Sequence, residues 1–150
     1  MTPLRVFQAV AQKMVQATES VAGVMKIATQ TQVSAGVDDS SVVTPKKLRA
    51  GFKASINANG YMAFPTWMGG LIIQWGTSQS DANGNGSLTF PMAYPSEFYG
   101  IWYGDASGSI SGVNAIGTLA YSKTGVTFGV RQVASTAGTL SAFFWLSIGK

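Results

Sequence analysis

The sequence predicts a mainly β protein, in which a short segment of helices and turns precedes an antiparallel β-sandwich. Residues 1–53 carry short helical patterns, each introduced by a residue that caps helices. Residues 54–150 carry short apolar runs at intervals of roughly 8–15 residues, separated by Gly, Ser and Asn, which is typical of a sandwich. The length of 150 residues suits one ordinary domain with an appendage. We therefore expect two parts, residues 1–53 as a thin segment of short helices and turns and residues 54–150 as a folded sandwich domain.

Two helices of the first part are predicted by Thr-Pro pairs, at Thr2-Pro3 and Thr44-Pro45. In each pair the threonine hydroxyl is expected to cap the helix, and the fixed φ of proline suits the first helical position. The residues that follow Pro3 are apolar at helical spacing over about three turns. They are Val6, Phe7, Val10, Ala11, Met14 and Val15.

A further short helix is predicted between these two. Thr29 to Gln32 has the spacing of a capping box, and Gly36 is a suitable C-cap. The next residues, Asp38 to Ser41, form a turn cluster whose side chains compete for backbone groups. The spacing of Asp38 and Asp39 differs from that of a calcium-binding loop.

The two Thr-Pro segments, Thr2–Arg5 and Thr44–Arg49, look like one unit that occurs twice. Repeats of this kind belong to arrays whose units cannot bury a core alone. A thin segment with one apolar stripe needs partners, and identical chains are the nearest ones. We therefore expect a homo-oligomeric stalk. Because Met1 directly precedes this motif, we interpret it as the start of a fragment of something longer.

The second part is predicted to consist of strands joined by polar turns. Asn59-Gly60 is a hairpin-type turn signal, Gly69-Gly70 opens the next strand, and a hairpin is expected to turn at Lys123 to Gly125. SDANGNGS and ASGSISG are expected to be loops, and FPMAYPSEF a connection punctuated by proline. The expected strands lie in YMAF, LIIQWGT, SLTF, YGIWYGD, LAYS, VTFGVRQV and LSAFFWLSIG, the last as a buried strand.

Composition excludes several classes of site. The chain has no Cys and no His, which removes disulfides, thiolate metal sites, the commonest general base and the commonest metal ligand. We expect no metal and no cofactor. No apolar run approaches the roughly 20 residues of a membrane span, and no signal peptide opens the chain, so we expect no membrane insertion.

The formal charge of +4 does not indicate a nucleic-acid partner. Residues 1–53 hold seven cations against three anions, whereas residues 54–150 hold three of each. Of the 17 aromatic residues, 15 lie from Tyr61 onward, away from the cations. Proteins that bind nucleic acid usually place Lys and Arg beside the aromatic residues that stack on bases.

The stretch from Gly23 to Leu48 closely resembles a repeat in the distal shafts of tail fibres of tailed phages and of R-type bacteriocins. The stretch from Gly60 to Gly76 resembles the start of the C-terminal tip domain of such fibres, and the terminal FFWLSIGK resembles the closing strand of that domain. The ordered combination covers the chain almost end to end. The matching residues are Gly23, Lys26, Ile27, Ala28, Thr29, Gln32, Gly36, Asp38, Asp39, Val43, Thr44, Pro45 and Leu48, and then Gly60, Tyr61, Pro65, Gly69, Gly70, Ile73, Gln74, Trp75 and Gly76.

The resemblance implies a homotrimeric fibre end whose tip binds a receptor on the host cell, commonly a lipopolysaccharide saccharide or another surface glycan. It implies a place in the virion, at the distal end of the tail fibre, after synthesis in the host cytoplasm. It also implies a tail fibre assembly chaperone before assembly, as in many Mu-like phages. Fibre tips of another class hold iron through His-x-His pairs, and a chain without His cannot build that site.

We do not expect the tip to be an enzyme. A glycosidase needs two carboxylates about 5–10 Å apart, and the tip has only Asp81, Glu97 and Asp105. Glu97 has no recognisable partner in its segment. The main alternative to receptor binding is a structural module that trimerises and caps the fibre, with the receptor site elsewhere, and a glycan depolymerase is the weaker alternative.

The candidate receptor-binding residues lie in and beside two predicted loops. An aromatic face beside a carboxylate suits a saccharide, and Trp102 and Tyr103 precede Asp105, although packing is the other interpretation. The loops are either receptor contacts or solvated turns, and Arg131 either lies on a strand surface or binds a glycan phosphate. The candidates are Asp81, Asn83, Asn85, Trp102, Tyr103, Asp105, Asn114 and Arg131.

The remaining tryptophans have simpler interpretations. Trp145 lies in an almost unbroken apolar run and is expected in the core. Trp67 and Trp75 lie in or beside the opening strand of the tip, where packing in the core or between subunits is favoured over a sugar platform.

Overall fold

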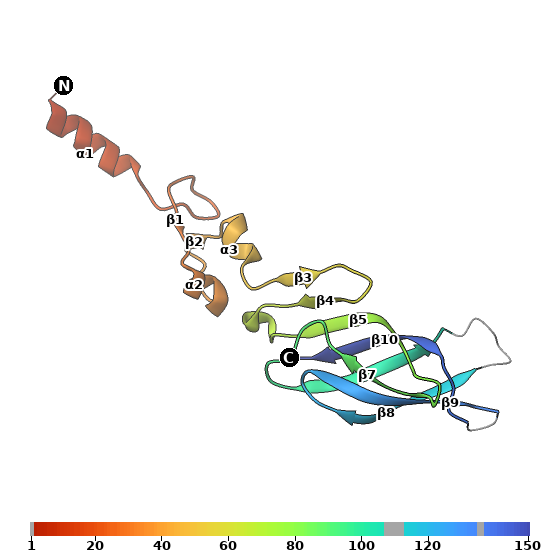
Figure 1. The fold of residues 1–150 in the computed structure, drawn as a ribbon. Helices are drawn as coiled ribbons and strands as arrows, with labels where there is room; N and C mark the ends of the chain where they lie inside the picture. The colour runs from red at the N-terminus through yellow and green to blue at the C-terminus, as the bar shows by residue number, and fades with distance from the viewer. Residues whose placement is uncertain (1, 107–112, 135–136) are drawn as a thin grey trace. The chain divides into compact units, whose positions relative to one another are not determined.

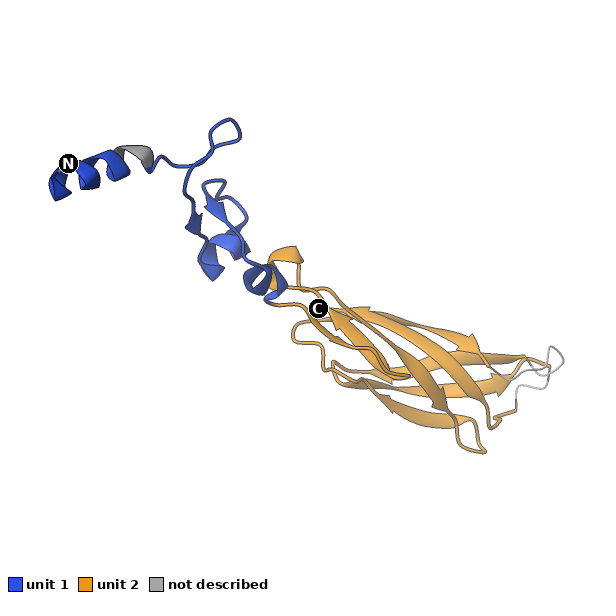
Figure 2. Ribbon diagram, turned by 90° about the horizontal axis from the view of Figure 1, so that it is seen from above, with its two compact units in different colours: residues 1–50 blue, residues 51–150 orange. Residues whose placement is uncertain are grey.

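The computed structural model describes residues 2–106, 113–134 and 137–150. The chain divides into two compact units, unit 1 (Met1–Ala50) and unit 2 (Gly51–Lys150), which are coloured separately in Figure 2. The boundary predicted from the sequence lies between residues 53 and 54. No helix in the described part of the chain is long and apolar enough to cross a membrane.

Unit 1 is made of short elements with almost no core. Its two-residue strands, β1 and β2, pair in parallel, and the Lys47 ammonium donates to the carbonyl of Ala28 beside them. Ala28 is the one apolar residue among the described part of unit 1 that is buried. The elements are α1 (Pro3–Lys13), β1 (Lys26–Ile27), α2 (Gln30–Ala35), β2 (Ser41–Val42) and α3 (Pro45–Arg49).

The capping box of α2 is confirmed. The Thr29 hydroxyl accepts the amide of Gln32 at 3.2 Å, and the Gln32 side-chain oxygen accepts the amide of Thr29 at 2.8 Å. Gly36 ends the helix with a φ of 67°, the left-handed conformation that favours glycine. The turn cluster is also present, because the Asp38 carboxylate accepts the backbone amide of Ser40 at 2.8 Å.

The hydroxyl caps predicted for α1 and α3 are wrong, although both helices begin at the expected proline. Thr2 and Thr44 share the same extended backbone, with φ and ψ of −79° and 150° and of −82° and 155°, but neither side chain makes a capping bond. The Thr44 carbonyl instead accepts the amides of Lys47 and Leu48, each at 2.9 Å. Proline at the first position has no N–H, so each helix begins with one fewer backbone amide that needs a partner.

Unit 2 is an antiparallel β-sandwich, which confirms the predicted fold class (Figure 1). One sheet has five strands in the order β3-β4-β5-β10-β7, and the other has three in the order β6-β9-β8. The elements are β3 (Lys53–Ser55), β4 (Gly60–Ala63), a 3-10 helix η1 (Thr66–Met68), β5 (Ile72–Gln79), β6 (Asn85–Thr89), β7 (Phe98–Asp105), β8 (Asn114–Tyr121), β9 (Gly125–Gln132) and β10 (Ala142–Gly149).

The core of unit 2 lies between the two sheets. Phe128 of β9 and Phe143 of β10 are fully buried, and their rings meet edge to face with centroids 4.7 Å apart. Trp145 is 3% exposed, which confirms its predicted place in the core. Burial of each such side chain stabilises the fold by about 1.5–3 kcal/mol. The core also contains Ala63, Ile72, Leu88, Phe90, Tyr94, Val126 and Val130.

The closing strand differs from the prediction that it is buried. Phe143, Trp145 and Ser147 of β10 point inward, whereas Phe144 is 58% and Leu146 is 41% exposed. Successive side chains of a strand point to opposite faces of the sheet. In a sandwich that covers one face of this sheet, an unbroken apolar run therefore leaves half of its side chains outside.

The predicted boundaries of two turns are also wrong. Gly60 opens β4 opposite Trp75, so the connection from β3 runs over residues 56–59, and the Asn59 side chain accepts the amide of Thr77 at 2.8 Å. Residues 85–86, expected in a loop, belong to β6 because they pair with β9. The turn between β8 and β9, at residues 122–124, is confirmed.

The two ends of the sandwich differ in what they contain. At the proximal end the chain enters unit 2, with Phe52 packed edge to face on Trp67, and the last residue, Lys150, bonds with Glu97. Strands β5 and β7 then run to the distal end, which holds residues 80–84, 105–106, 113–114 and 137–141. The two predicted loops therefore begin at the end of the sandwich opposite to the one at which the chain enters.

Candidate functional site

Six of the eight candidate residues lie at the distal end. They come from the β5–β6 turn, from the ends of the β7–β8 connection and from the end of β9. Residues 107–112, the middle of the second predicted loop, lie outside the described residues. The six are Asp81, Asn83, Asn85, Asp105, Asn114 and Arg131.

The β5–β6 turn is shaped by Asp81 and Gly84. One carboxylate oxygen of Asp81 accepts the amides of Asn83 at 2.9 Å and of Asn85 at 2.8 Å, as Asp does in many turns. Gly84 has a φ of 73°, and a Cβ there would collide with the carbonyl of Val130. The Asn83 side chain is exposed and makes no hydrogen bond with the described residues. This turn therefore presents an amide group on a rigid backbone.

Arg131 holds the same turn from β9. Its Nη1 donates to the carbonyls of Gly84 at 3.0 Å and of Asn83 at 3.3 Å, and its Nη2 donates to the Asn85 side-chain oxygen at 3.2 Å. Nη1 also donates to the carbonyl of Val130 at 2.8 Å. These bonds make Arg131 a positioning residue for the turn, and its contact with a phosphate stays a prediction.

A second group of bonds closes the base of the β7–β8 connection. The Asp105 carboxylate accepts the amide of Asn114 at 2.8 Å, and the Asn114 side chain donates to the Ser141 hydroxyl at 3.1 Å. The amide of Ser141 in turn donates to the Ser80 hydroxyl at 2.9 Å. Ser80 directly precedes Asp81, so this chain of bonds joins the two predicted loops at one end of the sandwich.

Trp102 and Tyr103 do not form one aromatic face, because they point to opposite sides of β7. Trp102 is 57% exposed on the outer face of the five-stranded sheet. Tyr103 packs against Phe143 with ring centroids 5.5 Å apart, and its hydroxyl lies 2.8 Å from that of Thr118. Burial raises the pKa of Tyr103. The structure thus separates Trp102 from the distal group, whereas Tyr103 ties β7 to β8.

The other two tryptophans are partly packed. Trp67 is 41% exposed and meets the Phe52 ring with centroids 6.4 Å apart. Trp75 is half-buried on the outer face of the five-stranded sheet, and its indole N–H donates to the carbonyl of Asn57 at 3.1 Å.

The carboxylates of unit 2 are divided between its two ends. Glu97 lies at the proximal end, where its backbone bonds with Lys150, whereas Asp81 and Asp105 lie at the distal end. Each distal carboxylate accepts at least one backbone amide. Among the described residues, no three acidic side chains are grouped as metal ligands.

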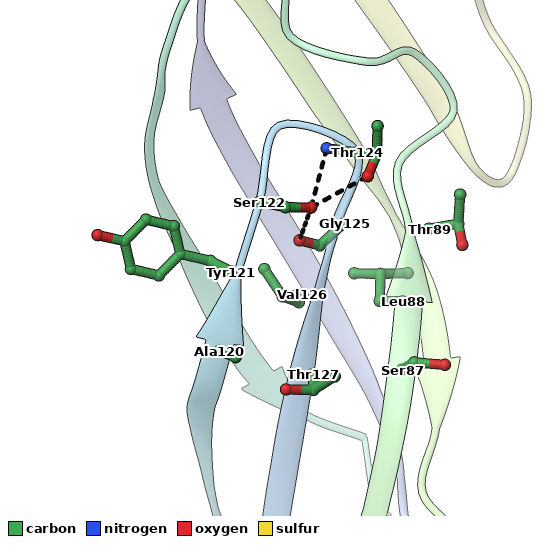
Figure 3. Close-up of a pocket in the computed structure, with 10 residues that line it drawn as sticks. All are labelled: Ser87, Leu88, Thr89, Ala120, Tyr121, Ser122, Thr124, Gly125, Val126 and Thr127. Carbon is green, nitrogen blue, oxygen red and sulfur yellow. Dashed lines mark hydrogen bonds between the residues drawn. The ribbon is translucent and has the colours of Figure 1, made fainter.

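The sequence analysis missed a shallow hollow of about 300 Å³ on the three-stranded sheet, near the proximal end. Figure 3 shows the Ser122 to Gly125 turn above it, with Thr127 and Ser87 below on β9 and β6. Tyr121, which is 71% exposed, lies at its edge. The signal in the sequence was the alternation of hydroxyl and apolar residues in SLTF and GVTF, which places hydroxyls on one outer face.

Comparisons with known proteins agree with this architecture. The family model described as "tail fiber protein gp53-like, C-terminal" matches residues 63–150. No curated protein matches the chain. Among solved structures, an N-truncated R2-type pyocin tail fiber is similar with a TM-score of 0.56 and 18% identity, over 89% of this chain and 56% of that one.

Two R1-type pyocin fibers show the same fold. The N-truncated R1-type tail fiber has a TM-score of 0.53 and 21% identity, over 71% of this chain and 97% of that chain. A P. aeruginosa R1 pyocin fiber fragment has a TM-score of 0.54 and 18% identity, over 100% of this chain and 44% of that chain. The chain thus spans little more than half of the R2-type fiber and less than half of the longer R1 fragment.

Proposed function

The chain belongs to the family of gp53-like tail fibre proteins through their C-terminal domain, and from this we propose that it is the distal tip of a tail fibre that binds a host-surface receptor. The receptor class we propose is a surface saccharide, with lipopolysaccharide as the first candidate. The tip would act as a homotrimer in the virion, after synthesis in the host cytoplasm. Before assembly, a tail fibre assembly chaperone would cover its apolar surface.

The observation that carries the proposal is the polar group at the distal end of unit 2. The chain enters the sandwich at the proximal end, so the distal end is the one that lies away from the point of entry within this domain. There, Asp81 and Arg131 fix a turn that presents the exposed Asn83. Rigid turns with amide and backbone groups suit saccharide hydroxyls, which both donate and accept hydrogen bonds.

A shallow neutral site is sufficient for such a tip. Unit 2 from residue 54 onward has three cations and three anions, so charge does not drive its binding. Three copies on one trimer raise the avidity of a weak contact by roughly 10² or more. The proposed site therefore needs no deep cleft.

We also propose that the tip binds its receptor without cleaving it. Glu97 lies at the opposite end from Asp81 and Asp105, and both distal carboxylates accept backbone amides that hold their loops. Incubation with host lipopolysaccharide should release no saccharide. Release that disappears in Asp81→Asn or Asp105→Asn would overturn this proposal.

The decisive experiment is adsorption of the purified protein to host cells and to a glycan array. Asn83→Ala removes an amide that makes no hydrogen bond with the described residues, so the fold is expected to survive. We expect a loss of adsorption of about tenfold or more, because each of three copies loses a contact. The matched control is Thr89→Ala, which removes an exposed hydroxyl at the hollow of Figure 3.

The pattern across the two variants separates the candidates. Loss in Thr89→Ala alone would place the receptor at the hollow and not at the distal turn. Adsorption of neither wild-type nor variant protein to any host glycan would favour the second candidate function, a module that trimerises and caps the fibre. The bonds that tie Asp105, Asn114 and Arg131 into the fold favour that second candidate.

A further inference from the structure

The outer face of the five-stranded sheet carries no ionisable side chain at its paired positions, and apart from Thr77 and Gln79 of β5 its side chains there are apolar. Leu146 of β10 lies between Trp75 of β5 and Trp102 of β7. In the same register, Ile148 pairs with Ile73, which pairs with Met62 of β4. We call this surface the sheet face, and it consists of Ala54, Met62, Ile73, Trp75, Trp102, Phe144, Leu146 and Ile148.

The sheet face is well exposed in the single chain. Phe144 is 58%, Trp102 57%, Leu146 41% and Met62 38% exposed. The two rings alone leave on the order of 200 Å² of apolar surface in water, since aromatic side chains have about 150–250 Å² each. With Leu146 and Met62 the exposed apolar area reaches about a few hundred Å², the size of the largest patch on a typical soluble monomer, and such patches are often functional. A partner that covers this patch would remove its apolar area from water.

The outer face of the other sheet mixes polar and apolar side chains. Thr127 of β9 pairs there with Ser87 of β6, and Arg131 lies on the same side of β9. On β8 of the same sheet, Leu119 is 67% exposed and lies over Gly129. Unlike the sheet face, this surface therefore carries hydroxyl groups and a charge that water can satisfy.

A second copy of this chain is the occupant that the composition favours. The sheet face offers no charge to a charged partner, so its complement must be equally apolar. Unit 1 has an exposed apolar stripe of its own on α1, where Phe7 is 74%, Val10 53% and Val6 46% exposed. When copies of one chain assemble in parallel, sheet face meets sheet face and α1 stripe meets α1 stripe. A different protein would need one apolar surface for each of the two.

We propose that the sheet face is the surface through which copies of unit 2 pack against one another. This rests on the homotrimer of the proposed function and assigns its interface within the tip. It places Trp102 in subunit packing and leaves the outer face of the three-stranded sheet and the distal turn accessible.

The mass of the full chain in solution tests this assignment without any receptor. Trp102→Lys places a charge on the sheet face, and Thr127→Lys places the same charge on the outer face of the other sheet. Sedimentation velocity is expected to give a trimer for wild type and Thr127→Lys. For Trp102→Lys we expect a monomer, with dissociation at about 100-fold higher protein concentration, because a buried unpaired charge is costly.

A labelling measurement covers the case in which Trp102→Lys fails to fold. The chain has no Cys, so Phe144→Cys and Thr127→Cys each carry a single thiol. In the assembled protein, a bulky maleimide is expected to react about tenfold or more slowly with Phe144→Cys than with Thr127→Cys, since reactivity follows access. A monomeric wild type, or a trimer with equal labelling rates, would overturn the proposal. The second result would leave receptor binding by the trimer intact.

Discussion

Gln74 is a fully buried amide on the inner face of β5, and its removal should weaken the tip more than its small size suggests. Its Nε2 donates to the carbonyl of Met92 at 2.7 Å, and its Oε1 accepts the amide of Met92 at 2.8 Å. Met92 lies in the connection between β6 and β7 and is not part of a strand. The Gln74 side chain therefore makes the two backbone hydrogen bonds with Met92 that a paired strand would otherwise make.

Gln74→Leu keeps the size and removes both bonds. Each backbone group left without a partner costs about 1–3 kcal/mol, and Met92 is half-buried, so two groups cost about 2–4 kcal/mol. The added apolar surface offsets about 1 kcal/mol. The net loss of about 2 kcal/mol corresponds to roughly 8–16 °C in Tm for a domain of this size.

Thermal unfolding at one fixed protein concentration measures this effect, and amide exchange at Met92 locates it. The control is Gln79→Leu, the same change at an exposed position of the same strand, with an expected Tm shift within about 2 °C. A Gln74→Leu protein that melts with wild type and keeps its Met92 amide protected would refute the reasoning.

Three further predictions concern single side chains. The side-chain and backbone bonds of Ser40 lower the pKa of Asp38. The contribution of Asp38 to stability is therefore present above about pH 3.9 and is lost as the pH falls through the lower folded pKa. An NMR titration should show a turn that loosens at low pH in wild type and not in Asp38→Asn. Burial raises the pKa of Tyr103, so its contribution to stability is present below about pH 10 and is lost as the pH rises through the higher folded pKa. Tyr103→Phe should lower the free energy of unfolding by about 1 kcal/mol at neutral pH in denaturant unfolding, and should lose less stability than wild type at alkaline pH. Arg131→Met should speed amide exchange at Asn85 about tenfold, because the β5–β6 turn loses its bonds to the guanidinium. An unchanged exchange rate would show that Asp81 alone holds the turn.

The sequence predicted four strands of the tip well because their signals are local, whereas it missed β3 and the first half of β8. Apolar alternation and Gly-rich turns placed β5, β7, β9 and β10 within a residue or two. The sequence did not predict the burial of Gln74 or the exposure of Phe144, because burial depends on which face of a strand the other sheet covers. The residue type alone does not carry that information.

In the candidate site, too, the sequence predicted local features and missed contacts between distant residues. The sequence predicted that the loops after β5 and β7 would matter, and the structure brings their ends together through Asn114, Ser141 and Ser80. It did not predict that Trp102 and Tyr103 would face opposite sides, although alternation along a strand implies it. The bonds of Arg131 to residues 83–85 join positions far apart in the chain, which no local pattern reveals.

The central claim is that the tip meets the receptor with its distal end. Because the chain has no Cys, one end of the sandwich at a time can be blocked by a polyethylene glycol chain on a single thiol. Ala82→Cys places the block at the exposed distal turn, and Ser96→Cys places it at the exposed proximal end, beside Lys150. We expect the distal block to reduce adsorption to host cells about tenfold or more and the proximal block to leave it within about twofold, with both unmodified variants adsorbing like wild type. Full adsorption with the distal end blocked, or loss only with the proximal end blocked, would contradict the account.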